Sequence, residues 1–200
     1  MTGQSQKQPR TLGCLRQIKI GDLKMALSNL SIFPQSLDAY VGGSIVGNWI
    51  DPSNFEEFEE FEKEIKKVTR NADEVMIADT NGADIGEYPN LPDYFEFCNA
   101  CEASDIDTDI LIEFANDRHE FNADIVKQAE DSYIGEYDSF RDYADESADE
   151  QMACCGEGVP QFLTNYFDYE SYARDLEYDF FVIERMEGGN YKGVAIFYNH

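Results

Sequence analysis

Few residues in this sequence combine a chemically useful type with a useful spacing, and three aspartates are the first candidates. Asp105, Asp107 and Asp109 have the spacing that begins an EF-hand calcium loop. The sixth and twelfth positions of such a loop need glycine and glutamate, but this chain has Ile110 and Asn116 there. Because both departures remove what calcium binding requires, we interpret the aspartates as the start of a helix, where carboxylates accept hydrogen bonds from free backbone N–H groups.

The five cysteines offer a second possible site. Cys98 and Cys101 have the spacing of redox and metal motifs. Cys154 and Cys155 could complete a four-thiolate zinc site, but neighbours in sequence fit tetrahedral coordination poorly. We expect Cys98 and Cys101 to lie on the buried face of a helix, where a free cysteine behaves as a small hydrophobic residue. We therefore predict that the protein holds no metal and no other cofactor.

The sequence offers little for acid–base or nucleophilic catalysis. Its two histidines, the residues that titrate near neutral pH, are His119 and His200. Glycosidases use a pair of carboxyl groups, but among 41 acidic residues no pair is distinguished by its position in the sequence. The 200 residues contain no nucleophile elbow, phosphate-binding loop or dinucleotide-binding glycine pattern. We therefore predict that the protein is not an enzyme.

Negative charge is the dominant property of the chain. The 41 acidic residues outnumber 15 lysines and arginines, which gives a formal charge of −26. Direct nucleic-acid binding is excluded as a default, because it needs basic residues to neutralise phosphates. Disorder is excluded because 42% of the residues are hydrophobic and 14% are aromatic. The odd number of cysteines, with no apolar signal or membrane-spanning run, predicts a soluble, cytoplasmic protein with free thiols and no membrane partner.

The charge is unevenly distributed along the chain. Residues 1–25 carry five basic residues and one acidic residue, whereas the remainder carries 10 basic and 40 acidic residues, a net charge of −30. We interpret residues 1–25 as a flexible basic extension; a true start at Met25 is an alternative that the sequence leaves open. Between Arg70 and Arg118 lie 13 acidic residues and no lysine or arginine. Like charges destabilise a compact state. Either a soluble or halophilic protein tolerates the negative electrostatic field of these residues, or that field is itself what the protein uses to function.

The apolar pattern predicts an α+β fold with three domains after the extension. Residues 26–88 are expected to form a small antiparallel sheet with one helix, residues 89–130 a helical middle domain, and residues 131–200 a second α+β domain. The order of the domains is therefore sheet and helix, then helices, then sheet and helices.

Individual elements follow from the same periodicities. Pro34 is expected to end the first strand, and the first helix to begin at residues 51–53, with Ser53 and Glu56 forming a capping box. A break is expected at residues 156–158, before two short helices and a final hairpin. The expected strands cover residues 27–33, 44–50, 73–78, 133–137, 180–184 and 193–198.

Three stretches of the chain carry a family resemblance. They are residues 42–51 (GGSIVGNWID), 85–91 (IGEYPNL) and 159–177 (VPQFLTNYFDYESYARDLE). In the third and most specific stretch, a Tyr-x-Asp-Tyr run precedes Arg-Asp-Leu, and the residues that carry it are Tyr166, Asp168, Tyr169, Tyr172, Arg174, Asp175 and Leu176. On these stretches the chain resembles the ArdA family of antirestriction proteins, carried by plasmids, transposons and phages, and the resemblance as a whole spans essentially residues 26–198. Ala173 stands where that family commonly has glycine.

The resemblance implies an elongated, three-domain homodimer that mimics B-form DNA. Such a protein would occupy the DNA-binding groove of type I restriction–modification enzymes, without catalysis and without a cofactor. The magnitude of the charge agrees with this. Duplex DNA carries about one charge per 1.7 Å of axis, so 30 net negative charges correspond to roughly 50 Å of duplex.

We expect the acidic surface of the mimic to lie in the stretch without basic residues and in its continuation. Its predicted members are Asp73, Glu74, Asp105, Asp107, Asp109, Glu113, Asp117, Glu130, Asp131, Glu136, Asp138, Asp142, Asp145 and Glu146. The Tyr166–Leu176 segment could serve the core or a dimer contact, and the sequence leaves both open. The alternative function is that of an acidic interaction module that sequesters or chaperones basic nucleoid proteins; it shares the charge but differs in shape and selectivity.

Repulsion among the carboxylates makes stability depend on salt. Raising the ionic strength from about 0.01 M to about 0.15 M shortens the Debye length from about 30 Å to about 8 Å. The melting temperature, followed by circular dichroism, should therefore rise over this range. A melting temperature that falls instead would contradict the view that unbalanced negative charge destabilises the fold.

Overall fold

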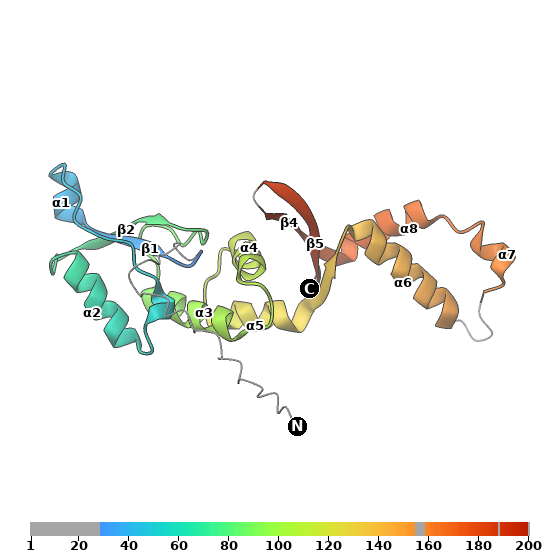
Figure 1. Cartoon of the computed structure of the whole chain (residues 1–200), viewed down its shortest axis with the longest axis horizontal. Helices are drawn as coiled ribbons and strands as arrows, with labels where there is room; N and C mark the ends of the chain where they lie inside the picture. The colour runs from blue at the N-terminus through green and yellow to red at the C-terminus, as the bar shows by residue number, and fades with distance from the viewer. Residues whose placement is uncertain (1–28, 155–158, 188, 200) are drawn as a thin grey trace, which may run out of the picture.

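The computed structural model describes residues 29–154, 159–187 and 189–199, which form an elongated α+β molecule (Figure 1). A small sheet with α1 and α2 lies at one end, and α6, α7 and α8 lie at the other (Figure 1). Helices α3, α4 and α5 and the hairpin of β4 and β5 occupy the space between them (Figure 1). The predicted α+β class and its small antiparallel sheets are confirmed.

The first sheet has two antiparallel strands, β1 (Ile32–Ser36) and β2 (Val75–Thr80). The prediction that Pro34 ends the first strand is wrong, because this proline lies inside β1. The strand register shifts between Phe33 and Pro34. A bulge in a two-stranded sheet tolerates a residue without an N–H group, since no full ladder bond is lost there. Residues 27 and 28 of the expected strand lie outside the described residues.

The strand expected over residues 44–50 does not form. Two isolated antiparallel bridges take its place, one between Gln35 and Gly47 and one between Ile32 and Ile50. Pro34 lies between the two bridged positions and has no N–H group to donate, so the ladder is interrupted there. The short helix α1 (Leu37–Val41) follows β1 directly.

The first long helix begins later than expected. A 3-10 turn, η1 (Pro52–Asn54), precedes α2 (Phe58–Val68). Asp51, rather than Ser53, caps the turn, because its carboxylate accepts a hydrogen bond from the Ser53 backbone N–H at 3.1 Å. The expected capping box is therefore wrong: the backbone is extended at Phe55, which separates the turn from the helix.

The predicted helical middle consists of α3 (Leu91–Ala103), α4 (Thr108–Arg118) and α5 (Ala123–Ser132). The aspartate run forms a helix start, as expected from the sequence. Asp107 is the N-cap of α4, and its carboxylate accepts a hydrogen bond from the Asp109 backbone N–H at 3.3 Å. The run therefore has a structural role that its sequence spacing predicted.

The second sheet is antiparallel, with β5 (Asn190–Tyr198) between β3 (Tyr133–Tyr137) and β4 (Phe180–Glu187). The predicted strand at 133–137 and the final hairpin are confirmed, although the hairpin strands are longer than expected. The break expected at residues 156–158 lies outside the described residues. The remaining elements are α6 (Phe140–Cys154), α7 (Gln161–Thr164), α8 (Tyr169–Leu176) and the 3-10 turn η2 (Glu177–Asp179).

One apolar cluster runs from the first sheet through the middle helices to the second sheet. The ring of Phe61 on α2 stacks on Phe95 of α3, with centroids 5.6 Å apart. The rings of Phe114 on α4 and Phe197 on β5 lie 4.8 Å apart. This continuous core joins the two sheets and the middle helices, while the division of the chain into three domains stays a prediction. In the described part of the chain, no helix has both the length and the apolar character of a membrane span.

The Phe114–Phe197 contact should dominate the stability of the junction between α4 and the second sheet. Both side chains are fully buried. Phe114→Ala should lower the free energy of unfolding by about 3–5 kcal/mol, because it removes apolar contact and leaves a cavity. Chemical denaturation measures this loss. The control Tyr178→Ala, at a residue that is 79% exposed, should change stability by less than about 0.5 kcal/mol. Equal effects of the two substitutions would contradict the assignment of the core.

Candidate functional site

The 14 carboxylates predicted for the acidic surface all lie outside the core. Thirteen are exposed and Asp145 is half-buried. They occur just before β2, before and along α4, at the end of α5, on and directly after β3, and along α6. The apolar core therefore presents these side chains to solvent, which any surface that imitates phosphates requires.

The structure does not gather the predicted carboxylates into one patch. Asp73 and Glu74 lie beside the first sheet, whereas Asp142, Asp145 and Glu146 lie on α6, near the opposite end of the molecule (Figure 1). The members on α4 and β3 lie between these ends. The surface is thus distributed along the length of the molecule.

A groove separates α4 from the β4–β5 hairpin. Its volume is about 380 Å³, and its lining includes Asp107, Asp109 and Glu113 of α4. The hairpin contributes Arg185 and Lys192 to the opposite wall, together with Glu184 and the apolar side chains of Ile183 and Met186. The groove therefore has an acidic wall formed by the helix, and the hairpin wall is mixed in charge but supplies both basic residues of the lining.

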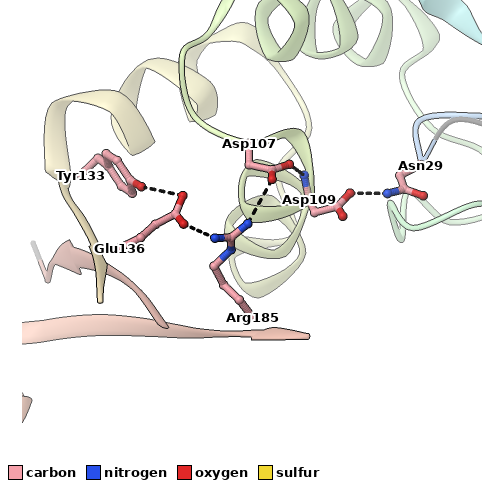
Figure 2. Close-up of polar contacts among 6 residues, drawn as sticks. All are labelled: Asn29, Asp107, Asp109, Tyr133, Glu136 and Arg185. Atoms are coloured by element: carbon pink, nitrogen blue, oxygen red, sulfur yellow. Dashed lines mark hydrogen bonds and ion pairs between the residues drawn. The ribbon is translucent and has the colours of Figure 1, made fainter. Parts of the chain in front are cut away.

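Arg185, which the sequence did not single out, contacts two of the predicted carboxylates (Figure 2). Its Nη2 atom donates to Oδ2 of Asp107 at 3.1 Å, and its Nη1 atom donates to Oε2 of Glu136. Asp107 caps α4 and Glu136 lies on β3, so one guanidinium joins elements that are 78 and 49 residues away in the chain. Local sequence patterns contain no signal for contacts at such separations.

The opposite side of α4 is tied to the first sheet. The side-chain amide of Asn29 donates to the Asp109 carboxylate (Figure 2). Asn116 donates from its amide to the Gly82 carbonyl oxygen at 3.1 Å, and its Oδ1 atom accepts from the Asp84 backbone N–H at 2.9 Å. These bonds connect α4 to the segment before β1 and to the loop after β2.

Arg118 closes the end of α4 against the core. Its guanidinium lies over the ring of Phe114, 3.7 Å from the centroid, and over that of Phe181 at 4.8 Å. Such cation–π contacts favour a cation that is partly removed from water. Helix α4 is therefore held at its start by Arg185, at its end by Arg118, and toward the first sheet by its hydrogen bonds with Asn29 and the loop after β2.

The signature segment Tyr166–Leu176 packs α8 on α6 largely through polar contacts. Asp168 caps α8 by accepting a hydrogen bond from the Ser171 backbone N–H at 3.0 Å, and this bond lowers the pKa of the Asp168 carboxyl. The Tyr169 hydroxyl donates to Asp149 at 2.5 Å. Of the segment's residues only Ala173 is buried. The segment is therefore mainly a surface feature, and its use as a dimer contact stays a prediction.

The remaining signature residues are also accessible. Tyr166 is 84% exposed, and the ion pair of Arg174 with Asp175 spans 3.8 Å at the surface. The Tyr172 hydroxyl accepts a hydrogen bond from the Gln151 amide at 2.8 Å, and Leu176 is half-buried. An aromatic, polar face is thus available beside the α6–α8 pair.

The cysteines and acids do not form a metal centre in the part of the chain that the structure describes. There, no three histidine, cysteine or acidic side chains are grouped so that they could hold an ion. Cys98 and Cys101 are buried on α3, as expected. Burial raises the pKa of Cys101 to about 12 and that of Cys98 further, so both remain neutral thiols at physiological pH.

Five tyrosines should titrate later than free tyrosine, whose pKa is about 10, namely Tyr94, Tyr133, Tyr137, Tyr143 and Tyr169. Burial raises the pKa of Tyr133 and Tyr143 to about 12, and it raises that of Tyr94 still more. Between about pH 10 and pH 12 the unfolded chain therefore binds fewer protons than the folded chain, and stability falls as pH rises. Phenolate absorbance should show an early and a late phase. Tyr143→Phe should reduce both the late phase and the alkaline loss of stability; a single phase near pH 10 would contradict the assigned burial.

Comparison with known proteins identifies the family of the chain. A family model described as antirestriction protein (ArdA) matches residues 32–189. A search of curated proteins found no significant match. The matched region covers most of the chain, including the first sheet, the middle helices and strands β3 and β4 of the second sheet, and it contains the α8 signature and Arg185. The chain therefore belongs to the ArdA family of antirestriction proteins.

Proposed function

We propose that this protein inhibits type I restriction–modification enzymes by mimicking B-form DNA in their DNA-binding groove. Membership of the family implies an antirestriction function and an interaction with restriction enzymes. The observation that carries the finer proposal is the distribution of the predicted carboxylates, which are solvent-accessible along an elongated molecule. Such an array can meet the lysines and arginines that line a DNA-binding channel.

The spacing of acids on α4 supports phosphate mimicry. Asp109, Glu113 and Asp117 repeat every four residues and are all exposed, so they share one face of the helix. Side chains four residues apart on a helix have Cβ atoms about 5–6 Å apart. This is close to the scale that separates successive phosphates, so a basic groove could contact several of the acids at once.

Rigidity supports the same proposal. A flexible acidic chain would lose conformational entropy when it entered the groove, whereas a folded mimic has lost that entropy already. The continuous apolar core and the contacts at both ends of α4 hold the carboxylates of the middle helices in place before binding. We propose that the protein acts in the cytoplasm as a homodimer of three-domain chains, without catalysis or a cofactor.

Competition with DNA is the direct test. The protein should displace labelled duplex, containing the recognition site, from a type I methyltransferase core at near-stoichiometric amounts. Displacement should weaken as salt rises, because the contacts replace those of phosphates. A folded protein that displaces no duplex would overturn the proposal, and displacement that does not respond to salt would remove phosphate mimicry as its basis.

Two matched sets of substitutions distinguish the effect of carboxylate position on duplex displacement from the effect of net charge. The first set is Asp105→Asn, Glu113→Gln, Asp131→Asn and Asp138→Asn. The second set replaces the exposed glutamates near and at the start of α2, namely Glu56, Glu57, Glu59 and Glu60, with glutamine. Each set removes four negative charges from the −26 of the chain.

The first set should weaken displacement by about 30-fold, if each contact contributes about 0.5 kcal/mol. The second set should have a much smaller effect, because its residues lie outside the predicted surface. Each single substitution of the first set should change the half-maximal concentration about twofold. Equal weakening by both sets would favour an acidic module that binds any basic protein.

A further inference from the structure

Arg185 adds a positive charge to the surface that, under the proposed function, faces the basic DNA-binding groove of the target enzyme. Its side chain is 29% exposed and lies between Asp107 and Glu136 (Figure 2). On one side of it is the groove beside α4, and on the other is a hollow of about 220 Å³ lined by Glu136, Tyr137, Asp138 and Lys192. If only net charge determined binding to the target, this arginine would weaken it.

The geometry around Arg185 uses a property that lysine lacks. A guanidinium is a planar fork of N–H donors, so two of its nitrogens can bind two different carboxylates at once. Here one terminal nitrogen contacts each carboxylate. Arg141 and Arg174 differ, since their ion pairs join positions at most four residues apart.

Both carboxylates are also held by other groups. Asp107 accepts a hydrogen bond from the Asp109 backbone N–H, because it caps α4. Glu136 accepts one from the Tyr133 hydroxyl at 3.4 Å through Oε1, which leaves Oε2 for Arg185. The arginine therefore connects two carboxylates whose positions are already restricted by α4 and β3.

Without this cation, Asp107 and Glu136 would face each other as like charges. Their repulsion would act between the start of α4 and β3, the elements that carry the acids in the middle of the molecule. The cation offsets this repulsion between two segments that carry further acids, such as Glu113 on α4 and Asp138 directly after β3.

We propose that Arg185 is a positioning residue that clamps α4 to β3, so that the carboxylates on the two elements keep the spacing that the target recognises. The clamp strengthens binding although it reduces the negative charge. This inference rests on the proposed function for its effect on the target, while the clamp itself can be measured in the free protein.

The test compares Arg185→Gln with Arg141→Gln. Each substitution removes one positive charge, but Arg141 pairs with Asp145 within α6, over 2.7 Å and one helical turn. If net charge decides binding, both variants should displace duplex from the methyltransferase core at least as well as the original protein. The clamp predicts that the two variants differ in how well they displace duplex. Arg185→Gln weakens displacement about tenfold, whereas Arg141→Gln leaves it unchanged or improves it.

Amide hydrogen exchange tests the clamp in the absence of a target. Arg185→Gln should speed exchange in the first turn of α4 and in β3, with no change in α2, while Arg141→Gln should leave α4 and β3 unchanged. Normal exchange in Arg185→Gln, or displacement as strong as that of the original protein, would overturn the proposal. If the original protein displaces no duplex, the proposed function fails and exchange alone decides whether the clamp exists.

Arg185→Lys provides a second variant if Arg185→Gln does not fold. It keeps the charge but cannot bind both carboxylates with one planar fork. Exchange and displacement should therefore lie between those of the original protein and those expected for Arg185→Gln. Values equal to the original in both measurements would show that charge alone, rather than the two-sided contact, is needed.

Discussion

Repulsion between carboxylates is the constraint on which the rest of this structure depends. An elongated molecule with a formal charge of −26 gains little stability from its surface. The free energy of folding must come from the apolar cluster that runs from β1 to β5, where phenylalanine rings pack on one another. The same core determines which carboxylates point outward and how far apart they lie. The acidic surface and the aromatic core are therefore linked, because a chain with so many mutually repelling carboxylates can fold only around a strongly apolar core.

Helix α4 connects this core to the surface. Its buried face, with Ile110, Leu111 and Phe114, belongs to the continuous cluster, whereas its exposed face carries regularly spaced acids. Hydrogen bonds from Asn116 tie it to the loop after β2, and Arg185 ties it to β3. A change in the position of α4 would therefore move acids relative to both sheets. This explains why one basic residue can matter on a surface dominated by negative charge.

The success of the sequence predictions varies with the range of the interactions involved. The middle helices, β3 and the hairpin were predicted correctly, because helical and strand periodicities are properties of adjacent residues. The errors lie between Pro34 and the start of α2. The expected strand over residues 44–50 is reduced to two bridges, because its ladder depends on pairing with a segment that contains a proline. The cap of the following turn was assigned to Ser53 instead of Asp51, since competing side chains near a helix start look alike in sequence.

The sequence by itself determined the negative charge, the absence of catalytic motifs, the helical middle and the family resemblance, because composition, periodicity and motif spacing belong to the chain before it folds. It also indicated which acids would be exposed, since charged side chains rarely lie in a core. Only the tertiary structure decided that Asp107 and Glu136 share Arg185, and that α4 lies between the two sheets. An ion pair depends on the distance between two charges in space, and residues 78 and 49 positions apart acquire that distance only through the packing of the intervening elements.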